Sequence, residues 1–170
     1  MKNFLFNQLG IRLDNYEEPK TKYSTHVNDC AFLTCSYLLN KSYPKVFKDL
    51  AKIGAKNGFS PDTEFVVHEY LEKNGYEGFC RTEKSYPLIE FLYNYKDIKC
   101  AILVESATGV AKHAFVYNCG TWMDCATNIE DGRLHEFLIS ETFGVYFKKK
   151  SKNPTILGLK EEMTPIKFNV

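Results

Sequence analysis

The spacing of apolar residues changes along the chain, from a helical period in its first part to strand-like alternation in its second. The most apolar helical stretch covers residues 28–39, where Ala31, Cys35 and Leu38 fall on one face and further apolar side chains cover much of the remainder. A helix that is apolar around most of its circumference is expected inside a protein. We therefore predict a buried helix that begins at or beside Cys30.

Proline and glycine signals bound two further helices. The first is predicted to begin near Pro44 and to stop at Asn57-Gly58, and the second to open at Ser60-Pro61 and to stop at Asn74-Gly75. Proline suits the first turn of a helix, and glycine readily adopts the left-handed conformation that ends one. A fourth helix is expected over residues 85–95.

Strand-like runs dominate the second half of the chain. They are rich in β-branched and aromatic residues, and turn signals at Thr108-Gly109 and Cys119-Gly120 separate some of them. The order of helices first and antiparallel strands afterwards is that of an α+β fold. The predicted strands cover residues 76–81, 99–104, 112–118, 121–125, 134–139 and 143–148.

The predicted organisation is a single domain over residues 1–170. An extended arm over 1–27 leads to a helical part over 28–97, and an antiparallel sheet follows over 98–150. No secondary structure is assigned to the tail over 151–170. The chain has 170 residues, of which 44% are apolar and 25% charged, so it is long enough to bury a core of its own.

Charge and cysteine content narrow the function classes. Lys and Arg together number 22 against 21 acidic residues, so no global field favours nucleic acid or an anionic membrane as a partner. The sequence holds no signal-peptide core and no apolar run of membrane length. We therefore expect a cytoplasmic protein whose six cysteines are free thiols.

Cys30 is the first candidate for chemistry. Asn28 and Asp29 are good helix N-caps, which places the thiol in the first turn. The free N–H groups and the positive end of the helix dipole there favour thiolate, the form that attacks carbonyl carbon. The alternative is that Cys30 is a small buried residue without chemistry.

His113 is the predicted base. The hairpin that follows it is expected to turn at Cys119-Gly120 through two or four residues. That register pairs Phe115 with Asp124, and alternation places His113 on the face of Phe115. Imidazole and carboxylate then lie on a diagonal with their Cβ atoms about 7 Å apart, which their side chains can bridge. With Cys30 nearby, the set has the logic of a nucleophile, a base and an orienting acid.

The other histidines are weaker candidates for the base. His68 lies in a predicted helix, His135 lacks an obvious partner, and His26 precedes Cys30 in the extended arm. A metal-binding module is an alternative, because six cysteines and four histidines are many soft ligands. No pair of cysteines has the short C-x-x-C spacing of structural zinc sites, so we predict neither a metal nor a cofactor.

The span from Asn28 to Cys125 resembles papain-like cysteine peptidases, especially the small bacterial and phage-borne proteins related to bacteriocin-processing peptidases. The matching features are the helix opened by Cys30, the helices that follow with Gly75, and the hairpin that runs from His113 to Asp124. The resemblance implies a papain-like fold with Cys30 as nucleophile, His113 as base and Asp124 as orienting residue. It implies hydrolysis of a peptide, isopeptide or amide bond through a thioester, in the host cytoplasm if the protein is phage-encoded.

One position departs from that family. Papain-like enzymes usually carry a glutamine six positions before the nucleophile to bind the oxyanion, and this chain has Ser24 there. Asn28 and His26 are the candidates to replace that donor, beside the backbone N–H of Cys30. Loss of one oxyanion donor typically costs about two to three decades in rate. A catalytically inactive papain-like interaction protein is therefore an open alternative.

The expected partner is a polypeptide or peptide-like substrate. A neutral charge balance and 13 Phe, 11 Tyr and 1 Trp favour an extended polypeptide in an apolar groove over a polyanion. The same three residues would also serve deamidation or acyl transfer to an amine, because the choice of acceptor lies in the shape of the pocket.

Overall fold

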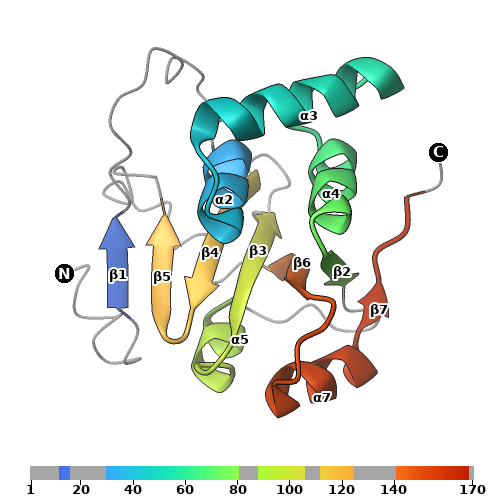
Figure 1. Ribbon diagram of the computed structural model, residues 1–170. Helices are drawn as coiled ribbons and strands as arrows, with labels where there is room; N and C mark the ends of the chain where they lie inside the picture. The colour runs from blue at the N-terminus through green and yellow to red at the C-terminus, as the bar shows by residue number, and fades with distance from the viewer. Residues whose placement is uncertain (1–11, 16–29, 81–87, 106–111, 125–140, 169–170) are drawn as a thin grey trace.

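The computed structural model describes residues 12–15, 30–80, 88–105, 112–124 and 141–168 (Figure 1). Within these ranges the chain has an α+β architecture. Its elements in order are β1 (Arg12–Asn15), α2 (Cys30–Leu39), α3 (Tyr43–Asn57), α4 (Glu64–Lys73), β2 (Tyr76–Cys80), α5 (Leu88–Asn94), β3 (Lys99–Glu105), β4 (Lys112–Asn118), β5 (Thr121–Asp124), β6 (Glu141–Lys148), α7 (Pro154–Glu162) and β7 (Thr164–Pro165).

The strands form one sheet in the order β1-β5-β4-β3-β6-β2-β7. Six of them pair antiparallel with their neighbours, whereas β1 pairs parallel with β5. Figure 1 shows β1 at one edge of the sheet and β7 at the other. The sheet thus extends beyond the predicted 98–150 range, because β1, β2 and β7 all come from outside it.

Two apolar clusters lie on opposite faces of the sheet. Alternation along β3 assigns Cys100 and Ile102 to one cluster and Ala101 to the other. The first cluster packs under α5 and α7, and the second under α2, α3 and α4 (Figure 1). The prediction of a buried helix at Cys30 is confirmed, because six of the ten residues of α2 are buried: Ala31, Phe32, Thr34, Cys35, Ser36 and Leu38.

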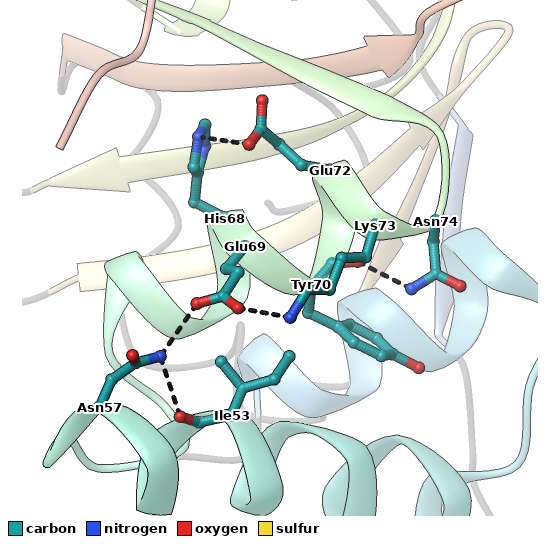
Figure 2. A network of polar contacts seen from close by, with 8 residues as sticks. All are labelled: Ile53, Asn57, His68, Glu69, Tyr70, Glu72, Lys73 and Asn74. Atoms are coloured by element: carbon teal, nitrogen blue, oxygen red, sulfur yellow. Dashed lines mark hydrogen bonds and ion pairs between the residues drawn. The ribbon is translucent and has the colours of Figure 1, made fainter.

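The helical hairpin of α3 and α4 is fixed at the loop that joins them. α3 ends as predicted at Gly58, whose φ of 73° is the left-handed conformation that glycine tolerates. The side-chain amide of Asn57 donates to the carbonyl oxygen of Ile53 at 3.1 Å and to Glu69 of α4 at 3.0 Å, as Figure 2 shows. These bonds tie the end of α3 to the middle of α4.

One predicted helix start differs from the structure. α4 begins at Glu64 rather than at Ser60-Pro61, because residues 60–63 form a turn in which the N–H of Thr63 donates to the carbonyl oxygen of Ser60 at 3.1 Å. The tail after residue 150, for which no secondary structure was predicted, contains α7 and β7. The predicted strand over 134–139 and the turn at Thr108-Gly109 lie outside the described residues.

None of the helices in the described part of the chain combines the length and the apolar character needed to cross a bilayer.

Candidate functional site

Cys30 stands at the start of α2, beside the sheet. The helix packs against β3 and β4, with Ala31, Cys35 and Leu38 in the same apolar cluster as Val116 of β4. Cys30 itself is only half-buried. The fold therefore holds the helix rigidly and leaves the thiol at its first turn partly accessible.

His113 is the second residue of β4 and is half-buried. Its ring stacks on Phe115, with 6.2 Å between the ring centroids and 22° between the planes. Phe115 in turn stacks on Trp122 of β5 at 3.8 Å. The imidazole therefore stands at the end of a row of stacked rings.

The β4–β5 hairpin has the predicted register. Asn118 pairs with Thr121, so the turn consists of the two residues Cys119 and Gly120, with φ of 47° and 81°. Positive φ at both central residues is typical of the turn that matches the twist of a hairpin. This is the register on which the predicted diagonal between His113 and Asp124 depends.

A cavity of about 430 Å³ lies where β3 ends and β4 begins, and both Cys30 and His113 line it. α2 covers one face of the sheet, whereas His113 shares the other face with Phe115. The cavity lies at the end of the β3–β4 pair, and its lining residues come from both faces, since Val104 belongs to one cluster and Leu103 packs against the other. The cavity has a size usual for ligand pockets.

The walls of the cavity are mostly apolar. Phe59 comes from the α3–α4 loop and Phe65 from the first turn of α4, and their ring centroids lie 5.2 Å apart. β3 contributes two successive residues, Leu103 and Val104, between which its register with β6 shifts. Such a bulge changes the direction of neighbouring side chains, so two consecutive residues can line one cavity.

Charged groups stand among the lining residues of the α3–α4 loop, α4 and β4. The Lys112 ammonium donates to the Glu64 carboxylate, and Asp62 accepts from the hydroxyl of Ser60. The Lys112 side chain is 57% exposed, so this ion pair adds little stability. It does connect the start of β4 to the start of α4 across the lining of the cavity.

Two other thiols are in surroundings unsuited to chemistry. Burial, with a smaller contribution from Cys30, raises the pKa of Cys35 to about 12. Burial likewise raises the pKa of Cys100 well above the ordinary value. Neither side chain lines the cavity, so among the described cysteines only Cys30 combines a helix start with a histidine in one cavity.

The remaining predicted site residues are only partly described. Asp124 ends β5, where its backbone pairs with that of Asn15 in β1. The structure does not describe the side chain of Asp124. Asn28 and His26, the candidate oxyanion donors, lie outside the described residues. His68 is buried elsewhere, with its Nδ1 3.2 Å from the Tyr146 hydroxyl, and it does not line the cavity.

Sequence reasoning did not find the wall formed by Phe59, Phe65 and Leu103. The available signal was Phe59, an aromatic residue directly after the helix-ending Gly58, which the structure leaves 44% exposed. A single exposed aromatic residue is common on protein surfaces, so Phe59 alone was a weak signal.

In the part of the chain that the structure describes, no three His, Cys, Asp or Glu side chains are grouped so that they could hold a metal ion. Comparisons with protein-family models, with curated proteins and with solved structures found no match.

Proposed function

We propose that this protein is a papain-like cysteine hydrolase that cleaves a peptide, isopeptide or amide bond. Cys30 is the nucleophile, His113 the general base and Asp124 the residue that orients the imidazole. The observation that carries the proposal is that Cys30, at the first turn of a buried helix, and His113, at the start of β4, line the same cavity.

The proposed reaction has two steps. His113 takes the proton of the Cys30 thiol, the sulfur bonds to the substrate carbonyl carbon, and the C–N bond breaks as the leaving amine receives that proton from His113. Water then loses a proton to His113 and attacks the thioester, the C–S bond breaks, and the carboxyl product leaves. The proton returns from His113 to the sulfur, so the enzyme is regenerated without a cofactor.

The cavity supports a substrate with an apolar group next to the scissile carbonyl. Phe59, Phe65 and Leu103 offer it an apolar wall in the cavity that Cys30 also lines. Burying an apolar side chain there contributes about 1.5–3 kcal/mol of binding. The mixed charges of Asp62 and Lys112 near this wall give a polyanion no preferred site.

The test is site-resolved alkylation of the native protein with limiting iodoacetamide, read by peptide mapping. Cys30 is expected to react first at neutral pH, and His113→Ala is expected to slow it by about tenfold or more, because general-base assistance is lost. Asp124→Asn should slow it less, since an amide can still orient the ring.

His68→Gln is the matched control, because it removes a histidine that does not line the cavity and should leave the rate at Cys30 unchanged. An unchanged rate in His113→Ala would remove the base from the mechanism. A panel of peptidyl vinyl sulfones, with Cys30→Ala as the blank, then reports the residues preferred beside the scissile bond.

A further inference from the structure

The last described residues of the chain run behind the cavity. After α7 the two residues of β7 pair antiparallel with the end of β2. The N–H of Ile166 then donates to the carbonyl oxygen of Gly78 at 2.9 Å. We call residues 164–168 the C-terminal strap. Backbone pairing fixes its course along the sheet edge, and beyond β7 the chain runs on past β2 towards α4 (Figure 1).

The far end of the strap packs on one wall of the cavity. The Phe168 ring meets Phe65 edge to face, with 5.7 Å between centroids and 84° between planes, and it meets His68 at 5.1 Å. Phe65 lines the cavity, whereas Phe168 is not among the described residues that do. Phe168 therefore stands behind the wall, in the edge-to-face geometry that aromatic pairs favour.

A second strap residue, Ile166, lies near the wall residue Leu103. A Cβ built on Gly144 would lie 3.1 Å from the Cδ1 of Ile166 and 3.8 Å from the Cδ1 of Leu103. The two side chains therefore converge over a residue that has no side chain of its own. Strap and wall thus meet through the Phe65–Phe168 pair, and Ile166 and Leu103 both border the space over Gly144.

We propose that the C-terminal strap sets the shape of the cavity, with Phe168 and Ile166 as positioning residues for Phe65 and Leu103. Both wall residues are only partly buried, and Phe65 packs directly on Phe168 of the strap. The inference rests on the proposed function, because it takes the cavity beside Cys30 as the place where the substrate's apolar group binds. The strap then governs which apolar groups of a substrate the cavity binds, and it does not change the reactivity of the Cys30 thiol.

Two alkylating reagents with one reactive group test this. Iodoacetamide is compared with N-(2-phenylethyl)iodoacetamide, and the ratio of their rates is measured at Cys30 and, as an internal reference, at the exposed Cys119. In the wild type the aromatic reagent should be favoured at Cys30 by about tenfold relative to Cys119. Phe168→Ala and Ile166→Ala should each reduce that preference by about three- to tenfold, with the iodoacetamide rate within twofold of wild type.

Further variants separate positioning from general loss of structure. Phe168→Leu, which keeps apolar volume, should retain part of the preference and serves in place of Phe168→Ala if that protein does not fold. Tyr93→Ala removes a 57% exposed ring from α5 and should change nothing. Because Phe168 acts through Phe65, adding Phe168→Ala to Phe65→Ala should cause no further loss of preference.

An unchanged preference in both Phe168→Ala and Ile166→Ala would overturn the inference. Equal ratios at Cys30 and Cys119 in the wild type would overturn it as well, because the cavity would then select nothing. Failure of the proposed function shows separately, as an iodoacetamide rate at Cys30 that does not depend on His113.

Discussion

Replacing Gly54 by alanine is expected to destabilise the protein, although the same change in an open helix stabilises. Gly54 is buried in the last turn of α3, and its carbonyl oxygen accepts the N–H groups of Gly58 and Phe59. A Cβ on Gly54 would lie 2.5 Å from the carbonyl oxygen of Phe59 and 3.3 Å from the nitrogen of Pro61. Both are backbone atoms, so the loop that carries Phe59 into the cavity wall would have to move.

Three contributions set the magnitude for Gly54→Ala. Overpacking against backbone costs about 1–3 kcal/mol. The displaced Phe59 N–H loses a hydrogen bond worth about 1 kcal/mol, and the higher helix propensity of alanine contributes about 1 kcal/mol in the opposite direction. The last two cancel, which leaves a net loss of about 1–3 kcal/mol. Gly158→Ala in α7 is the matched control, since nothing lies within 4 Å of its added Cβ, and it should gain up to about 1 kcal/mol.

Equilibrium unfolding in urea measures both variants. Trp122, the single tryptophan, is buried and its fluorescence reports loss of the sheet. Gly54→Ala should unfold at lower urea than wild type and Gly158→Ala at higher urea, with unchanged slopes. A Gly54→Ala protein at least as stable as wild type would refute the close approach of the loop to α3.

Two further predictions concern titrating groups. Brief alkylation of the native protein near neutral pH should leave Cys35 unmodified, because burial raises its pKa to about 12; modification of Cys35 as fast as Cys30 in peptide maps would contradict this. Burial, opposed by the charge of Glu72, lowers the pKa of His68 in the folded protein. As pH falls, His68 is therefore protonated in the unfolded chain before it is protonated in the folded one. The stability present above about pH 6.5 is therefore lost as pH falls towards the lowered folded pKa. The free energy of unfolding is measured by urea titration between about pH 8 and pH 5. It should change less with pH in His68→Gln than in wild type, and an equal change in both proteins would count against this prediction.

Much of the fold follows from local signals. α3 ends at Gly58 and the β4–β5 hairpin turns at Cys119-Gly120 because glycine or a tight turn fixes the backbone there, whatever packs around it. The edge strands β1 and β7 were not predictable in this way, since two to four residues carry no period and their pairing depends on distant strands. The start of α4 was predicted too early because Ser60 and Thr63 bond to each other in a turn before the helix.

In the candidate site, too, the residues set by local sequence could be predicted and those brought together by tertiary packing could not. Cys30 and His113 were predicted together because a helix start and a hairpin register are readable in sequence, and both residues line one cavity in the structure. The wall formed by Phe59, Phe65 and Leu103 was not found, because it arises where a loop, a helix and a bulged strand meet. Contacts between separate elements are set by tertiary packing and do not show in the spacing of apolar residues along the sequence.

The position of β7 has a consequence for association between molecules. An exposed sheet edge offers unpaired N–H and C=O groups to a strand of another chain and so invites aggregation. Here the edge strand on this side has only the two residues Thr164 and Pro165, and proline has no N–H to donate. The long apolar strands β3 and β4 lie in the interior of the sheet, three strands or more away from this edge. The strand order therefore protects the most aggregation-prone segments and ends the sheet with a residue that discourages further pairing.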